Sequence, residues 1–224
     1  MATVLVIGAS RGIGLEFVRQ YAEAGDRVIA TARDAAGLTR LRELGATSLK
    51  LDVADPASIS SLAWQLDGEE IDIALYVAGV WSGDDAQAPP TQPEFDRVMH
   101  TNVLGAMQAI PQVAPLVEAS RRGGKFAFIS SGMGQIGGAE SSHGWTYRVS
   151  KAALNMAVAA AQHDYPRAVL VALCPGWVQT DMGGAGAPLS VAESVSAMRR
   201  TLANLTAEHQ GSFLHHDGRR YDGW

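Results

Sequence analysis

Tyr147 and Lys151 are the pair in this 224-residue chain whose types and spacing most readily support chemistry. Two side chains four residues apart on a helix lie on one face, about one turn from each other. A phenol can give or take a proton, and an ammonium at that range typically lowers its pKa by about 1–3 units. The pair therefore indicates acid–base catalysis, although Tyr and Lys at this spacing also occur on helices that do no chemistry.

A glycine-rich turn near the start of the chain forms a second candidate site. The apolar run 3–7 is typical of a buried strand, Gly8-Ala-Ser-Arg-Gly12-Ile-Gly14 follows it, and residues 15–22 have helical periodicity. Glycines let a backbone approach a pyrophosphate, and a helix N-terminus directs free N–H groups at the anion. Strand, glycine turn and helix together predict a nucleotide site. A structural turn is the alternative, because the spacing is not G-x-G-x-x-G.

The end of the next predicted strand, residues 27–31, indicates which dinucleotide would bind. An NAD site usually has a carboxylate here to bond the ribose 2′-OH, whereas a cation suits a 2′-phosphate. Ala32 and Arg33 occupy this strand end, and Arg11 in the glycine turn is a second cation. We predict NADP(H) over NAD(H), against the alternative that both arginines are solvated surface residues.

Predicted strands and helices alternate along the chain. Further strands are expected over 47–51, 71–77, 125–129, 167–173 and 212–214, and further helices over 35–44, 56–66, 93–119 and 190–205 and in the stretch that carries Tyr147. Pro111 and Pro115 should bend or divide the long helix. The alternation predicts an α/β fold over residues 1–224. We expect a single doubly wound Rossmann-type domain with a seven-stranded, mostly parallel sheet and helices on both faces.

Ligands of such sheets bind at the carboxyl ends of the strands. The candidate motifs lie at these ends: Gly8–Gly14, Arg33, Asp52, Ala78-Gly79, Ser130-Ser131 and Pro175–Thr180. Asp52 could accept a hydrogen bond from an adenine amino group, or it could simply stabilise a turn. The shared edge predicts one composite site.

Charge and cysteine content exclude several classes of protein. The net charge is −5 with no block of Lys or Arg, which argues against nucleic acid and anionic membranes as partners. Cys174 is the only cysteine, so no internal disulfide can form, and we expect a cytoplasmic protein. No metal site is expected, because His215 and His216 are adjacent and Cys174 has no cysteine partner.

The helix that carries Tyr147 is apolar nearly all round from Val149 to Ala161. Such a helix is usually buried on both sides. In a single layer of helices over a sheet, the outer side requires a second subunit. We therefore predict a homodimer or homotetramer.

Across nearly its whole length the chain resembles the short-chain dehydrogenases/reductases. The resemblance is carried by motifs in the family's order: Gly8-x-x-x-Gly12-Ile-Gly14, Asp52-Val53, Ala78-Gly79, Asn102, Ser131, Tyr147-x-x-x-Lys151 and Pro175-Gly176. The run 175–184 and Trp224 most resemble the C-factor/sniffer-type carbonyl reductases. Ile7 departs from the usual Thr, and Tyr76-Val77 depart from the usual Asn-Asn. The loss of those amides is expected to weaken cofactor binding or local rigidity.

The resemblance implies catalytic roles for four residues. Tyr147 would give the proton to the carbonyl oxygen, and Lys151 would lower its pKa and hold the nicotinamide ribose. Ser131, with Ser130 as its rival, would hydrogen-bond the substrate oxygen, and Asn102 would organise a water beside Lys151. The implied cofactor-binding residues are Gly8, Ser10, Arg11, Gly12, Ile13, Gly14, Arg33, Asp52, Val53, Ala78, Gly79, Tyr147, Lys151, Pro175, Gly176, Val178 and Thr180.

These residues predict an NADP(H)-dependent oxidoreductase that interconverts a carbonyl and an alcohol by hydride transfer. Trp81, Trp145 and Trp177 lie close in sequence to active-edge motifs and favour a small hydrophobic or aromatic carbonyl, unless they only pack on the core. A non-catalytic NADP(H)-binding signalling or sensor protein of C-factor type is the alternative. An epimerase or dehydratase of the extended type is disfavoured by the short chain and the glycine spacing.

Overall fold

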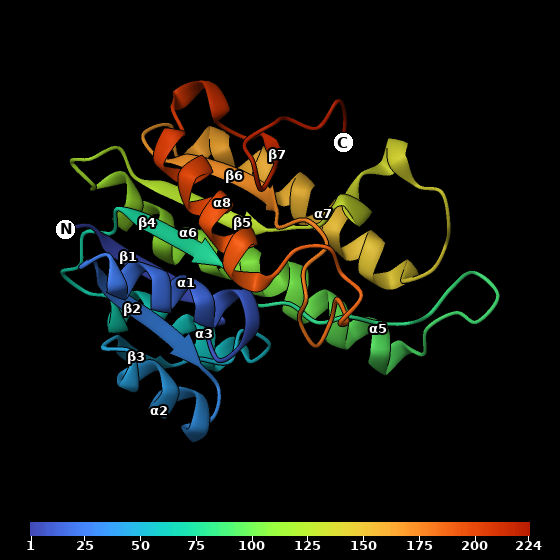
Figure 1. The fold of residues 1–224 in the computed structure, drawn as a ribbon, viewed down its shortest axis with the longest axis horizontal. Helices are drawn as coiled ribbons and strands as arrows, with labels where there is room; N and C mark the ends of the chain where they lie inside the picture. The colour runs from blue at the N-terminus through green and yellow to red at the C-terminus, as the bar shows by residue number, and fades with distance from the viewer.

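The computed structural model describes residues 1–224 and contains one seven-stranded sheet (Figure 1). Its strand order is β3-β2-β1-β4-β5-β6-β7, and every pairing is parallel. The strands are β1 (Thr3–Ile7), β2 (Arg27–Ala32), β3 (Thr47–Lys50), β4 (Ile73–Tyr76), β5 (Lys125–Ile129), β6 (Val169–Cys174) and β7 (Phe213–His215). The predicted doubly wound sheet is confirmed, and it is parallel throughout rather than mostly parallel.

The helices cover both faces of this sheet (Figure 1). They are α1 (Gly12–Glu23), α2 (Ala35–Glu43), α3 (Pro56–Ser60), α4 (Leu62–Gln65), α5 (Gln92–Met99), α6 (Gly105–Glu118), α7 (Trp145–Ala161) and α8 (Val191–Asn204). The helix predicted over 56–66 is therefore two short helices. None of the helices combines the length and the apolar character that crossing a bilayer requires.

Alternating strand side chains build two cores, one on each face of the sheet. Leu5 and Ile7 of β1 pack with α3, α4, α6 and α7, whereas Val4 and Val6 pack with α1, α2 and α8. The chain leaves β1 in one direction towards β3 and returns on its other side to β4. This reversal of strand order opens a crevice at the carboxyl edge between β1 and β4, the place where ligands of such sheets bind.

The long helix predicted over 93–119 is divided, but not at its prolines. A π-helical turn, η1 (His100–Leu104), separates α5 from α6, while Pro111 and Pro115 lie inside an unbroken α6. At the point of division, Gly105, the first residue of α6, packs closely against the end of β4 and the segment after β3. A Cβ atom on Gly105 would lie 2.5 Å from Tyr76 Oη and 2.7 Å from the carbonyl oxygen of Val53. The prolines were expected to bend or divide this helix, and they do not divide it.

One side of the helical layer remains apolar and exposed. The large exposed side chains on α5, η1, α6 and α7 are Phe95, Leu104, Met107, Trp145, Val149 and Met156. The outer side of α7 is thus uncovered in the single chain.

Candidate active site

A cleft of about 420 Å³ lies at the carboxyl edge of the sheet. It brings together most of the residues expected to bind a cofactor, from six separate parts of the chain. Those that line it are Gly8, Ser10, Arg11, Gly12, Ile13, Gly14, Arg33, Asp52, Val53, Ala78, Gly79, Tyr147, Lys151, Pro175 and Thr180. The cleft lining does not include Asn102, Ser131, Gly176 or Val178.

The glycine turn fits the pyrophosphate of a dinucleotide. A Cβ atom on Gly8 would lie 2.6 Å from the Ala78 nitrogen, and one on Gly14 would lie 2.3 Å from the Gly8 oxygen. No side chain caps α1, its first turn holds no acidic residue, and no protein acceptor takes the N–H groups of Gly12, Ile13 and Gly14. Free N–H groups at a helix N-terminus, beside backbone that only glycine permits, form an anion cradle.

The charges at the end of β2 suit a 2′-phosphate better than a 2′-hydroxyl. Arg33 is exposed and lines the cleft. The carboxylate of Asp34 accepts the Gly37 N–H at 2.7 Å and so caps α2. Arg11 pairs with Asp181 at 3.0 Å. Arg33 is therefore the cation with no partner, and the neighbouring carboxylate is engaged elsewhere.

Asp52 makes the turn contact that is one of its two predicted roles. Its Oδ1 atom accepts the Ala54 N–H at 3.0 Å, which is the turn role. The residue also lines the cleft, and its predicted contact with an adenine amino group stays a prediction.

Tyr147 and Lys151 are both buried, with 7% and 3% of their surfaces exposed. The Lys151 ammonium lies 5.5 Å from the centroid of the Tyr147 ring and donates to the Ile129 carbonyl at 2.8 Å. Burial raises the pKa of Tyr147, and the Ser131 hydroxyl partly opposes this by hydrogen bonding. Burial lowers the pKa of Lys151 to about 8. The expected lowering of the Tyr147 pKa is not seen: the net shift is upward, because desolvation of the phenol dominates.

The two candidate serines have different environments. Ser130 Oγ donates to Asn155 Oδ1 at 2.6 Å in the protein interior. Ser131 Oγ accepts the Met133 N–H at 3.1 Å and interacts with the Tyr147 phenol. Ser130 lines the cleft, but its hydrogen is already used. Ser131 does not line the cleft, and its hydroxyl is the one that interacts with the Tyr147 phenol.

Asn102 is fully buried and its amide is satisfied by protein groups. Its Oδ1 accepts the Val80 N–H at 2.8 Å, and its Nδ2 donates to the Val80 carbonyl at 3.0 Å and to Ser150 Oγ at 2.9 Å. Ser150 Oγ in turn donates to the Tyr147 carbonyl at 2.7 Å. Both amide hydrogens of the side chain are therefore engaged, and the water beside Lys151 stays a prediction. It links the segment after β4 to α7, a link that the sequence did not reveal.

Tyr76 bridges the same region. Its phenol donates to the Thr101 carbonyl at 2.8 Å, and Thr101 Oγ1 donates to the Arg97 carbonyl at 2.9 Å. In the family that the sequence resembles, an amide is usual at this position and ties backbone segments near the cofactor. Here the Tyr76 phenol ties the end of β4 to η1, the π-helical turn that carries Asn102.

Several further residues pack near Tyr147 and the loop after Ser131, and most of them carried no clear sequence signal. The Trp81 ring lies 4.8 Å from the Tyr147 ring, at an angle of 53°. Cys174 Sγ accepts the Gly132 N–H at 3.1 Å, and a Cβ atom on Gly132 would lie 2.9 Å from Tyr221 Oη. The end of the chain therefore packs against the loop after Ser131. Of these residues, Trp81 was expected near the site from its position after the Ala78-Gly79 motif, whereas the contacts of Gly132 and Tyr221 were not.

The other two predicted tryptophans lie differently. Trp145 is 42% exposed among the apolar side chains on the outer side of α7. Trp177 is 61% exposed, and its indole donates to the Gly183 carbonyl at 2.8 Å. Among the three, Trp81 alone packs its ring against the Tyr147 ring.

The lowered pKa of Lys151 predicts a pH-dependent stability. In the folded chain this amine loses its proton near pH 8, whereas in the unfolded chain it keeps it to about pH 10.5. Between these values the unfolded chain binds more protons, so this residue's contribution to stability rises with pH. Urea titrations should show the unfolding free energy of the wild type gaining about 2 kcal/mol over Lys151→Met between about pH 8 and pH 10. The exposed-lysine variant Lys50→Met should show no such gain, and a flat or falling difference for Lys151→Met contradicts the prediction.

Comparison with known proteins places this site in a family. The family model described as short chain dehydrogenase matches residues 2–187. The C-signal protein of Myxococcus xanthus is 36% identical over 151 residues, covering 66% of this chain and 90% of that protein. The carbonyl reductase Sniffer of D. melanogaster covers 100% of both chains with a TM-score of 0.91 and 25% identity. A carbonyl reductase from Pseudomonas aeruginosa PAO1 in complex with NADP covers 100% of both chains with a TM-score of 0.83 and 28% identity. The chain belongs to the short-chain dehydrogenase family, with similarity to C-signal and Sniffer.

Proposed function

We propose that this oxidoreductase uses NADP(H) to interconvert a carbonyl and an alcohol, with Tyr147 as the proton donor and acceptor. One observation carries the proposal. The buried Tyr147, with Ser131 beside its phenol, lies in the same cleft as a glycine cradle for a dinucleotide. Acid–base chemistry and hydride transfer can meet at that edge of the sheet.

The chain's own groups prepare the proton transfer. The bound nicotinamide would supply or accept the hydride. Burial keeps the proton on Tyr147, so the phenol is ready to donate to a carbonyl oxygen held between it and Ser131. Lys151, with a pKa of about 8, is mostly charged at neutral pH and would stabilise the phenolate as it forms. Ser131, rather than Ser130, is proposed for the substrate contact, because Ser130 is bonded to Asn155.

The cofactor would lie along the carboxyl edge. The N–H groups of Gly12–Gly14 would take the pyrophosphate, Arg33 the 2′-phosphate, and Lys151 the nicotinamide ribose. The stretch Pro175–Thr180 would seat the nicotinamide. The fit at the glycine turn and the free Arg33 support this arrangement.

We infer a hydrophobic or aromatic carbonyl as substrate. The Trp81 ring lies against Tyr147, and Met133 approaches the same place, since a Cβ atom on Gly144 would lie 2.4 Å from the Trp81 ring and 3.1 Å from the methyl carbon of Met133. Apolar walls around a few polar groups are typical of sites for small apolar ligands.

Tyr147→Phe tests the catalytic role. We expect kcat to fall at least about 100-fold, the range for loss of general acid catalysis, because the ring remains and the proton is lost. The measurement is NADPH oxidation with a panel of aromatic ketones, aliphatic aldehydes and quinones, alongside the Kd of NADPH, which should change less than about twofold. A Phe variant that keeps most of its kcat on every substrate of the wild type refutes the role.

The same assay separates the enzyme from a binding protein. A sensor of C-factor type would bind NADPH and turn over no carbonyl on the panel. The burial of Tyr147 and Lys151 beside Ser131 supports the enzyme, because a binding protein needs no proton donor there.

Arg33→Ala tests the cofactor preference. We expect the Kd of NADPH to rise about tenfold or more while the Kd of NADH stays unchanged, because only NADPH carries the phosphate that the guanidinium would bind. Arg42→Ala, an exposed arginine on α2, is the matched control and should change neither Kd. Wild-type protein that binds NADH as tightly as NADPH contradicts the preference.

We also infer that the protein is a homodimer or homotetramer. The exposed apolar side chains of α5, η1, α6 and α7 would be covered by the partner. Light scattering at micromolar concentration should give two or four times the protomer mass, and Met156→Glu should lower it, because a charge would be buried in the interface. Trp64→Glu on α4, where the tryptophan is 79% exposed outside this group, is the control. A monomeric wild type contradicts the inference.

The cytoplasm is the compartment we infer. Cys174 is the only cysteine and is buried as a free thiol, so the fold uses no disulfide and suits a reducing environment.

A further inference from the structure

The helix that carries Tyr147 begins without a cap of its own. The residue before α7 is Gly144, with φ of +69° and no side chain that could accept a hydrogen bond. It must be glycine, because a Cβ atom there would lie 2.4 Å from the Trp81 ring. The first N–H groups of any helix have no partner within the helix, so those of α7 need acceptors from elsewhere.

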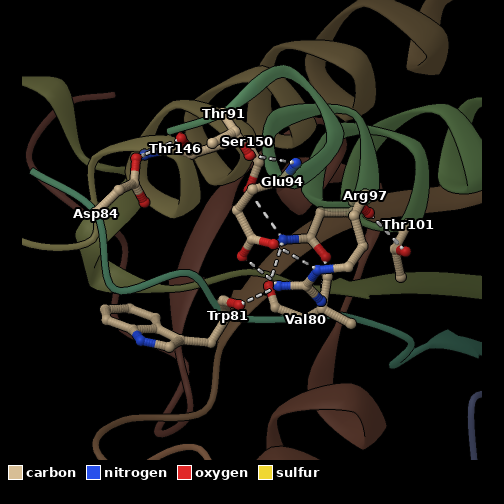
Figure 2. Close-up of polar contacts among 10 residues, drawn as sticks. Val80, Trp81, Asp84, Thr91, Glu94, Arg97, Thr101, Thr146 and Ser150 are labelled. Carbon is tan, nitrogen blue, oxygen red and sulfur yellow. Dashed lines mark hydrogen bonds and ion pairs between the residues drawn. The ribbon is translucent and has the colours of Figure 1, made fainter. Parts of the chain in front are cut away.

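Asp84, about sixty residues earlier in the chain, supplies these acceptors. Its backbone carbonyl accepts the N–H groups of Gly144 at 2.9 Å and Trp145 at 3.1 Å. Its carboxylate Oδ2 accepts the Thr146 N–H at 3.1 Å and the Thr146 hydroxyl at 2.5 Å. A carboxylate is also favoured at this end by the helix dipole. One residue thus satisfies three successive N–H groups, from Gly144 before α7 to Thr146. Figure 2 shows the contact between the Asp84 carboxylate and Thr146.

The segment that carries Asp84 is itself held in place. Asn102 bonds both the N–H and the carbonyl of Val80, and Arg97 donates to the Trp81 carbonyl at 2.7 Å. Glu94 pairs with that guanidinium at 2.7 Å (Figure 2). Asp84 therefore bonds α7 from a segment that is itself hydrogen-bonded to α5 and η1. These contacts fix the start of α7 relative to α5 and η1.

Tyr147 is the third residue of α7, directly after Thr146. The first turn of a helix is the part that frays most readily when its N–H groups lose their acceptors. The Trp81 ring, from the same segment as Asp84, packs on the Tyr147 ring at 4.8 Å. The segment 80–84 thus holds both the backbone and the ring around the phenol.

We propose that Asp84 is a positioning residue for Tyr147: by capping α7 from the segment after β4, it holds the first turn of the helix and with it the proton-donating phenol. This inference rests on the proposed function of Tyr147. Burial raises the pKa of Asp84, but polar contacts with Ser82 and Thr146 outweigh it and leave that pKa below its ordinary value. The capping group is therefore a carboxylate at neutral pH.

The test compares Asp84→Ala, Asp84→Asn and a control, Asp55→Ala. Asp55 caps α3 by accepting the Ala57 N–H at 3.0 Å, so its loss removes a similar cap from a helix without catalytic residues. For each protein we would measure kcat with NADPH and 4-nitrobenzaldehyde or phenanthrenequinone, the Kd of NADPH, the Tm, and amide hydrogen exchange over residues 144–150.

For Asp84→Ala we expect kcat to fall about tenfold, the factor that corresponds to about 1.4 kcal/mol, with the Kd of NADPH unchanged. Exchange of the first turn of α7 should rise by a similar factor. Asp84→Asn should recover most of kcat, because the amide oxygen still accepts the Thr146 N–H. Asp55→Ala should lower the Tm and leave kcat as in the wild type.

Wild-type kcat in Asp84→Ala, or unchanged exchange over 144–150, overturns the proposal. If Asp84→Ala does not fold, Thr146→Val decides, since it removes one hydrogen bond to the same carboxylate. Lower kcat with faster exchange supports the proposal, and wild-type values overturn it. If the wild type reduces neither carbonyl, the proposed function fails for these substrates, and the exchange data alone still show whether Asp84 holds the first turn.

Discussion

Gly8 and Ala78 lie in backbone contact where β1 and β4 end, and the rest of the site depends on this closeness. A single added Cβ atom at Gly8 would lie 2.6 Å from the Ala78 nitrogen, so the two strand ends meet only because the side chain is absent. The contact brings the anion cradle of α1 next to the segment 78–84. Val80 in that segment is hydrogen-bonded to Asn102, and Asp84 at its end accepts hydrogen bonds from the start of the helix that carries Tyr147.

Burial decides the protonation states in the cleft. Removing Tyr147 and Lys151 from water disfavours the charged form of each, so the phenol pKa rises and the amine pKa falls to about 8. The two effects leave a neutral phenol beside a mostly charged amine at neutral pH. Such a pair is prepared to donate a proton and to stabilise the anion that remains. The Ile129 carbonyl keeps the amine in place through a 2.8 Å hydrogen bond.

The end of β4 shows how the fold accommodates a departure from its family's pattern. Tyr76 stands where an amide is usual, and its phenol reaches the Thr101 carbonyl. The longer side chain needs room, which Gly105 leaves by having no Cβ atom. The same contact lies at the π-helical turn that carries Asn102. Tyr76, Gly105 and the π turn are therefore one arrangement, and we expect substitutions among them to be coupled energetically.

The sequence by itself determined the order of strands and helices, the parallel sheet and the edge at which the motifs gather. These features follow from local apolar periodicity and from the rule that links parallel strands through helices. Three motifs could also be identified from the sequence, because each lies within a few neighbouring residues: the glycine turn, the Arg33 strand end and the Tyr147–Lys151 spacing.

The tertiary structure alone decided which partners the polar groups have. Ser130 is bonded to Asn155, the amide of Asn102 serves Val80 and Ser150, and Asp84 caps a helix that begins at Trp145. It also decided that burial, and not Lys151, dominates the Tyr147 pKa, and that the long helix divides at residues 100–104 rather than at a proline. The physical reason is that hydrogen-bond partners, desolvation and close packing depend on residues that lie far apart in the chain and meet only when it folds.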